Sequence, residues 1–258
     1  MGEKINVKEI VKRKKEELKV EVDALKVKGI EPKLAVILAS DDEASKIYVG
    51  KKRKMCEEMG ILQEEFILDS TVETQDVVDI IQKLNEDKSV SGILVQLPLF
   101  KHLDMDTILD SISYKKDVDG FHPLTLGKLF IGEDETFISC TPKGIMTILD
   151  DIGTEYVGKH AVVVGRSRIV GKPISQLLLK RGATVTICHS KTKDISSFTR
   201  QADILVAAVG RAHIITKDMS EKGHWSIGEY RVYIPSIDDI DKVIPLIIQL
   251  LEINNSFL

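Results

Sequence analysis

The stretch AVVVGRSRIVGKP, residues 161–173, decides how the second half of this chain folds. Its apolar residues indicate a short buried strand, Gly165 begins a tight turn, and Pro173 lies near the start of the helix that follows. Such a helix N-terminus favours an anion, because free backbone N–H groups and the helix dipole point at the same place. The glycine spacing is not G-x-G-x-x-G, so this loop alone predicts a phosphate site and a plain βα turn about equally well.

The next predicted strand, residues 184–189, indicates which dinucleotide would bind. NAD-binding folds place Asp or Glu after this strand to hold the ribose hydroxyls, whereas this chain continues with Ser190 and Lys191. Together with Arg166, these residues offer charge and hydrogen bonds to a 2′-phosphate. The sequence therefore favours NADP over NAD, and a further strand at 204–210 completes a dinucleotide-type half-fold.

The first half of the chain also alternates between strand and helix patterns, which predicts a largely parallel sheet. Helices are expected over residues 7–28, from the Tyr48 region to Gly60, and over 74–85, with strands at 33–39, 66–68 and 92–97. Thr141 and Pro142 then resemble the cap and first turn of a helix that ends at Gly153. We place the change of domain near this helix.

The helix that contains Tyr48 carries a lysine among its apolar positions. Residues three and four apart share a helix face, and the face here consists of Ser45, Tyr48, Lys52, Cys56 and Met59. Desolvation would lower the pKa of Lys52 and make it usable as a general acid or base. The basic run 51–54 is otherwise typical of a solvated face whose side chains extend into water.

Composition narrows the class of protein. A chain of 258 residues forms one large or two modest domains, and its net charge of -4 gives no reason to expect nucleic acid or a membrane as partner. Cys56, Cys140 and Cys188 have no metal-ligand spacing, so we expect reduced thiols and no metal. The start has no apolar signal region and no run of about 18 apolar residues occurs, which predicts a cytoplasmic protein.

Five motifs, taken in order, resemble the bifunctional methylenetetrahydrofolate dehydrogenase/cyclohydrolase family. They are SKIYV with Lys52, GILVQLPL at 92–99, KDVDGF at 116–121, CTPKG at 140–144 and GRSRIVGKP at 165–173. The resemblance runs to about Gly223. It implies an α/β fold of two domains: an N-terminal α/β catalytic domain that binds folate, over 1–140, and a C-terminal Rossmann-type NADP-binding domain, over 141–258, with a cleft between them.

The resemblance further implies a homodimeric enzyme of one-carbon metabolism and purine biosynthesis, with tetrahydrofolate derivatives as substrates. It would oxidise 5,10-methylenetetrahydrofolate with NADP and hydrolyse the 5,10-methenyl product to 10-formyltetrahydrofolate. Lys52 would be the catalytic acid/base, Tyr48 would position the folate, Gln96 would tune the lysine, and Asp119 would anchor the pterin. The expected NADP site consists of Gly165, Arg166, Ser167, Ser190 and Lys191.

Beyond Gly223 the chain departs from the family. Relatives normally continue into a strand ending Asp-Val-Gly and later carry a PVPGGVGPMT loop that closes the folate and nicotinamide sites, and neither is present here. One alternative is therefore a non-catalytic or dehydrogenase-impaired relic that still binds NADP or folate. Short-chain dehydrogenases also use Tyr-x-x-x-Lys, but their dinucleotide loop precedes that pair, whereas here Gly165 follows Tyr48.

Overall fold

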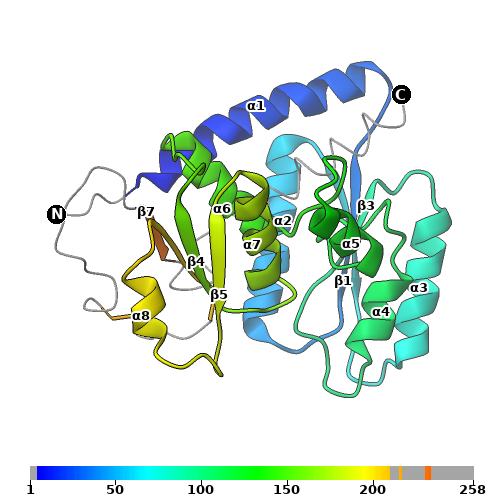
Figure 1. Cartoon of the computed structure of the whole chain (residues 1–258). Helices are drawn as coiled ribbons and strands as arrows, with labels where there is room; N and C mark the ends of the chain where they lie inside the picture. The colour runs from blue at the N-terminus through cyan, green and yellow to red at the C-terminus, as the bar shows by residue number, and fades with distance from the viewer. Residues whose placement is uncertain (1–4, 210–214, 217–229, 234–258) are drawn as a thin grey trace. The chain divides into compact units, whose positions relative to one another are not determined.

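The structure is a computed structural model that describes residues 5–209, 215–216 and 230–233. These residues divide into two compact units, the first extending through Gly127 and the second beginning at Lys128. Each unit contains a parallel β-sheet with helices on both of its faces (Figure 1), which confirms the predicted two-domain α/β fold. The predicted domain boundary between residues 140 and 141 stays a prediction.

The first unit is built on a three-stranded sheet in the order β2-β1-β3. Its elements are α1 (Val7–Val27), β1 (Lys33–Leu38), α2 (Glu43–Met59), β2 (Leu62–Ile67), α3 (Thr74–Glu86), β3 (Gly92–Val95) and α4 (Met105–Ser111), and α5 (Pro123–Ile131) runs across the boundary. From β1 the chain passes to β2 on one side of the sheet, and it then crosses over β1 to reach β3 on the other side. Because such crossovers are right-handed, α2 and α3 lie on opposite faces (Figure 1).

Burial explains why β1 is central. All of its residues from Leu34 to Leu38 are buried, as expected for a parallel strand covered on both faces. A short segment extends the sheet beyond β3, where Asp117 forms a parallel bridge with Ile93 and the Ile93 N–H donates to the Lys116 carbonyl at 2.8 Å. The segment that follows Asp117 therefore reaches the same sheet edge as the end of β3.

The second unit contains a four-stranded parallel sheet in the order β5-β4-β6-β7. Its elements are α6 (Cys140–Asp151), β4 (His160–Val164), α7 (Gly171–Lys180), β5 (Thr184–Cys188), α8 (Ile195–Thr199), β6 (Ile204–Ala207) and β7 (Tyr230–Tyr233). Alternate strand residues pack in two clusters. Ala161 and Val163 face α6 and α7, whereas Val162 and Val164 face α8, as the period of two in a strand requires.

Several boundaries differ from the sequence predictions. The helix expected to begin at Thr141 begins at Cys140 with Ser139 before it, so Thr141 is not its cap; Pro142 still lies in the first turn, where no intrahelical N–H is needed. Strand β2 begins at Leu62, four residues before the predicted strand. The start was missed because the polar residues of this edge strand interrupt the apolar pattern. Helices α4, α5 and α8 and strand β7 were not predicted.

All three cysteines are buried, and none of them forms a disulfide bond. Within the described ranges, no helix combines the length and apolar character needed to cross a membrane. Apart from β7, the atypical tail after Gly223 lies outside the described residues.

Candidate active site

Helix α2 buries the predicted lysine. Asp42 begins the helix by accepting a hydrogen bond from the Ser45 N–H, and Gly60 ends it in the left-handed conformation. Lys52 is only 6 % exposed, whereas the other residues of the basic run 51–54 are exposed to solvent. The predicted face is confirmed, since Ser45, Cys56 and Met59 are also buried and Tyr48 is half-buried.

Gln96 holds the ammonium group of this lysine. Lys52 Nζ donates to Gln96 Oε1 at 2.6 Å, and Gln96 Nε2 donates to the Leu97 carbonyl at 2.7 Å. The second bond fixes the orientation of the amide so that its oxygen faces Lys52. The backbone N–H of Gln96 donates to the Ile37 carbonyl at 2.8 Å, which ties the backbone of Gln96 to β1.

This pair lies where an open parallel sheet normally binds ligands. Gln96 directly follows β3, and the chain leaves β1 toward β2 but leaves β3 toward the Asp117 segment on the opposite side. Such a reversal leaves a crevice outside the carboxyl ends of the two strands. A buried amine that is hydrogen-bonded to a fixed amide oxygen at that place is suited to proton transfer.

Cys56, one helical turn after Lys52, is fully buried. Burial raises the pKa of the Cys56 thiol to about 12, although the nearby Lys52 charge opposes this shift. The thiol therefore stays protonated at neutral pH. Cys56 contributes packing rather than a nucleophile.

Tyr48 lies one turn before Lys52 on the same helix. Its ring contacts a cation, with Lys51 Nζ 5.6 Å from the ring centroid. Because residues four apart share a face, Tyr48 and Lys52 are directed to the same side of α2.

The KDVDGF motif forms a tight loop that contains two acids in different environments. Asp119, the predicted pterin anchor, is half-buried, whereas Asp117 is 1 % exposed. Burial raises the pKa of Asp117 to about 6 from 3.8, against hydrogen bonds from the backbones of Phe121 and His122 and the side chain of Thr125, which lower it. Sequence reasoning assigned no role to Asp117, because a one-residue bridge produces no periodic pattern.

In the second unit, two glycines bring backbone segments into direct contact. Gly165 has φ 132°, and a Cβ there would collide with the Ala208 carbonyl. A Cβ on Gly171 would collide with the Gly165 carbonyl and lie 2.8 Å from the Arg166 nitrogen. The turn after β4 therefore requires glycine at both positions, so that the N-terminus of α7 packs against the strands.

Ser167 changes one detail of the predicted anion site. Its hydroxyl oxygen accepts hydrogen bonds from the N–H groups of Val170 at 3.1 Å and Gly171 at 3.2 Å, and its carbonyl accepts one from Lys172. These N–H groups, which we expected to be free for a phosphate, are therefore already satisfied. Ser167 shapes the turn, and its hydroxyl hydrogen is still able to donate to an anion.

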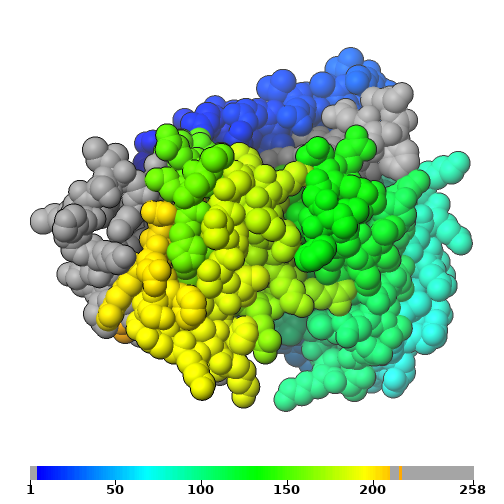
Figure 2. All heavy atoms as spheres, viewed as in Figure 1, coloured from blue at the N-terminus to red at the C-terminus, as the bar shows by residue number. Residues whose placement is uncertain are grey.

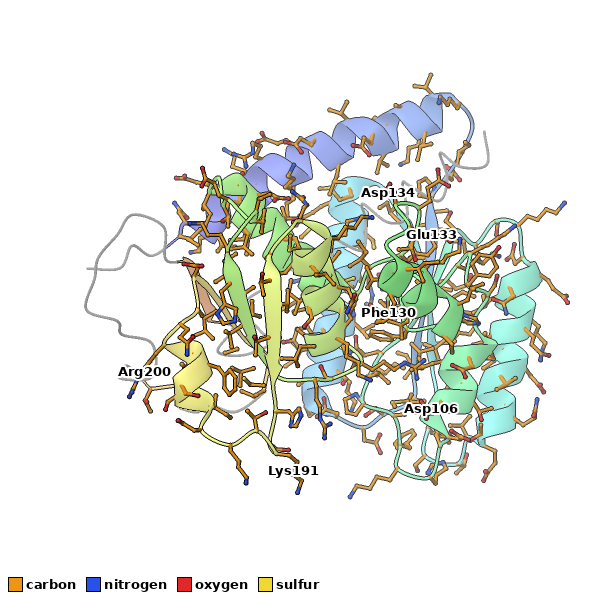
Figure 3. All side chains as sticks on the ribbon, viewed as in Figure 1. Asp106, Phe130, Glu133, Asp134, Lys191 and Arg200 are labelled. Carbon is orange, nitrogen blue, oxygen red and sulfur yellow. The ribbon has the colours of Figure 1, made fainter. Side chains whose placement is uncertain are left out.

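Arg166, Ser190 and Lys191 are all exposed, and they follow β4 and β5 at the carboxyl edge of the sheet. The 189–192 turn is held by the Thr192 hydroxyl, which accepts from the His189 N–H at 2.9 Å. The yellow segment after β5 forms part of the surface in Figure 2, and the Lys191 side chain extends away from the ribbon in Figure 3. The glycine contacts and these cationic groups fit a phosphorylated dinucleotide.

Two family models match the chain. The catalytic domain of tetrahydrofolate dehydrogenase/cyclohydrolase matches residues 5–119, and the NAD(P)-binding domain of the same family matches residues 139–228. The bifunctional protein FolD of Lysinibacillus sphaericus is 50 % identical over 219 residues, which cover 85 % of this chain and 77 % of that protein. The FolD protein of Moorella thermoacetica is 49 % identical, covering 84 % of this chain and 77 % of its own.

Solved structures agree with this similarity. FolD methylenetetrahydrofolate dehydrogenase/cyclohydrolase from Campylobacter jejuni is 38 % identical, with a TM-score of 0.88, over 95 % of this chain and 96 % of that one. The Trypanosoma brucei enzyme, solved with NADP cofactor and inhibitor, is 29 % identical, with a TM-score of 0.80, over 95 % and 93 % of the two chains.

Proposed function

This chain belongs to the tetrahydrofolate dehydrogenase/cyclohydrolase family, and on that premise we propose that it is an NADP-dependent methylenetetrahydrofolate dehydrogenase and methenyltetrahydrofolate cyclohydrolase. It oxidises 5,10-methylenetetrahydrofolate to the 5,10-methenyl form and hydrolyses that form to 10-formyltetrahydrofolate. The observation that carries the proposal is the buried Lys52, whose Nζ lies 2.6 Å from Gln96 Oε1 at the carboxyl edge of its sheet.

The dehydrogenase step needs a folate held beside a dinucleotide. NADP, when bound, supplies the acceptor for the hydride that leaves the methylene carbon. Gly165 and Gly171 keep the turn close to the strands, and Arg166, Ser190 and Lys191 bind the 2′-phosphate. Asp119 accepts hydrogen bonds from the pterin, and Tyr48 lines the folate site beside Lys52.

The cyclohydrolase step is proton transfer by Lys52. Water adds to the methenyl carbon as neutral Lys52 Nζ accepts one of its protons. The hydroxyl group of the adduct then loses its remaining proton to solvent and becomes the carbonyl, and the carbon–N5 bond breaks as N5 accepts the proton held by Lys52. Gln96 keeps Nζ in one position, and the low exposure of Lys52 keeps bulk water away from it. The result is a formyl group on N10.

The altered tail leaves a second candidate, a relic that binds NADP or folate without turnover. It is not favoured, because the named relatives are bifunctional FolD proteins and Lys52, Gln96, Tyr48 and Asp119 are all present. Cofactor binding in the absence of turnover would select it.

The cytoplasmic location, the homodimer and a role in purine biosynthesis are further parts of this proposal, which rest on the family resemblance. Sedimentation velocity of the purified chain tests the dimer directly, since a monomer of 28.8 kDa sediments more slowly than a pair.

The experiment that tests the function supplies the purified chain with 5,10-methylenetetrahydrofolate and NADP. NADPH and 10-formyltetrahydrofolate should both accumulate, and 5,10-methenyltetrahydrofolate added alone should be hydrolysed. If NADP binds but neither product forms, the enzyme assignment is wrong and the relic is the better description.

A further inference from the structure

We infer that Asp117 is a positioning residue, which sets the place of Asp119 relative to the Lys52–Gln96 pair. The inference rests on the proposed function for the role of Asp119 as the folate anchor. Asp117 itself does not touch substrate in this account, because its side chain is buried and turned into the loop.

Asp117 accepts hydrogen bonds from two residues that follow Asp119 in the loop. Its carbonyl accepts a hydrogen bond from the Gly120 N–H at 3.1 Å, and its carboxylate Oδ2 accepts one from the His122 N–H at 2.8 Å. Gly120 has φ 66°, a left-handed conformation that closes the turn. Asp119 thus lies inside a turn whose following residues are both tied to Asp117.

The start of this turn is anchored to the sheet and to a helix. Asp117 pairs with Ile93 of β3, three residues before Gln96. Lys116 Nζ donates to the carbonyls of Leu84 at 2.8 Å and Asp87 at 2.7 Å, at the C-terminal end of α3. The position of Asp119 relative to Gln96 is therefore set through β3.

Burial makes the Asp117 carboxylate depend on the hydrogen bonds that it accepts. A fully buried acid is costly unless its oxygens accept hydrogen bonds, and here the accepted bonds come from the backbone of the loop that carries Asp119. A side chain too short to accept them would leave those N–H groups unsatisfied and let the loop move. Displacing Asp119 would weaken folate binding without changing Lys52.

A double-mutant cycle on the full chain tests this inference, with tetrahydrofolate as the probe and its dissociation constant measured by calorimetry. Asp117→Ala should raise the constant about tenfold or more, whereas Asp117→Asn, which keeps an acceptor, should stay within about threefold of the wild type. In an Asp119→Ala background, Asp117→Ala should add less than about threefold, because the residue it positions is gone.

Asp104→Ala is the matched control. Asp104 also accepts backbone hydrogen bonds, from Asp106 at 3.1 Å and Thr107 at 3.2 Å, but at the start of α4. Its removal should lower the melting temperature and leave tetrahydrofolate binding unchanged. If Asp117→Ala does not fold, Asp117→Ser replaces it in the same cycle.

The outcomes separate this inference from the proposed function. Equal effects of Asp117→Ala with and without Asp119, or an unchanged dissociation constant in folded Asp117→Ala or Asp117→Ser, would overturn the positioning role alone. Tetrahydrofolate binding without turnover would overturn the proposed function while leaving the cycle readable. A wild-type chain that binds no tetrahydrofolate would overturn both.

Discussion

At the scale of single residues, burial separates one lysine from its neighbours. Lys51 and Lys54 lie on the solvent side of α2, while Lys52, rotated onto the apolar face, loses water and gains Gln96. A lysine ammonium in water is a poor proton-transfer group near neutral pH, because its charged form is well solvated, and burial removes that solvation. Chemistry at this site therefore depends on packing as much as on residue type.

Asp117 gives a pH prediction with a definite sign. Its folded-state pKa, about 6, lies above its ordinary value of 3.8, so the folded state binds the proton more tightly than the unfolded state between these values. The contribution of Asp117 to the free energy of unfolding should fall as pH rises from about 4 to about 6. Asp117→Asn, which cannot ionise, should gain stability relative to the wild type over that range, by up to about 3 kcal/mol.

Chemical denaturation of both proteins between pH 4 and pH 7 measures this difference. The control is Asp104→Asn, because hydrogen bonds from Thr107 lower the pKa of Asp104 and move its titration below this range. Its difference from the wild type should stay flat. A flat difference for Asp117→Asn as well would show that Asp117 titrates normally.

The cofactor preference is a second prediction at residue scale. Arg166→Ala and Lys191→Ala should each weaken NADP binding by about 10- to 150-fold, the equivalent of about 1.5 to 3 kcal/mol for a charge-assisted contact, and leave NAD binding nearly unchanged. Fluorescence titration with both cofactors measures this. Lys159→Ala, before the amino end of β4, is the control and should affect neither. Equal wild-type dissociation constants for NADP and NAD would remove these residues from the 2′-phosphate site.

At the scale of elements, the sequence predicted the regular βα units well and the irregular joins poorly. Strands such as β1 and β4 are unbroken apolar runs, and α2 and α7 carry apolar residues at helical spacing, so periodicity identifies them. The Asp117 bridge and the capping by Ser167 depend on where distant backbone groups meet, which periodicity does not encode. The same limit applies to the Lys52–Gln96 hydrogen bond, which joins α2 to the end of β3.

The close packing of the turn between β4 and α7 can be tested by adding a methyl group to it. Gly171→Ala should displace the turn, because the added Cβ meets the Gly165 backbone, and NADP affinity should fall about tenfold or more. The control is Gly127→Ala, since a Cβ at that helical position meets no atom within 4 Å outside the neighbouring backbone of its own helix. It should keep NADP affinity and stabilise the chain by up to about 1 kcal/mol. Unchanged NADP binding in a folded Gly171→Ala variant would contradict the close-packed turn.

At the scale of the whole molecule, the chain combines a family-like body with a different end. The family models cover residues 5–119 and 139–228, and β7 still pairs in parallel with β6 beyond that match. The residues proposed to bind phosphate and to transfer protons all precede Gly223, while the family loop that closes the nicotinamide and folate sites is missing from the sequence. Cofactor binding and hydride transfer should therefore respond differently to the tail.

Replacing the residues after Gly223 with the corresponding segment of a FolD relative tests this separation. The dehydrogenase rate should rise much more than NADP affinity, because a displacement near 1 Å of the reacting atoms costs about 100-fold in rate. Steady-state rates and NADP titrations on both chains provide the comparison. If the chain as given already matches the replaced version in rate, the residues after Gly223 are not needed for the chemistry.

The central claim, that the buried Lys52 makes this chain a folate enzyme, is tested most directly by hydrolysis of 5,10-methenyltetrahydrofolate, which needs no dinucleotide. The measurement compares the full chain with Lys52→Met and with Lys54→Met, an exposed lysine of the same basic run. The full chain and Lys54→Met should both hydrolyse this substrate, and Lys52→Met should do so about 10² to 10⁴ times more slowly. An unchanged rate in a folded Lys52→Met variant would show that Lys52 does not transfer the proton.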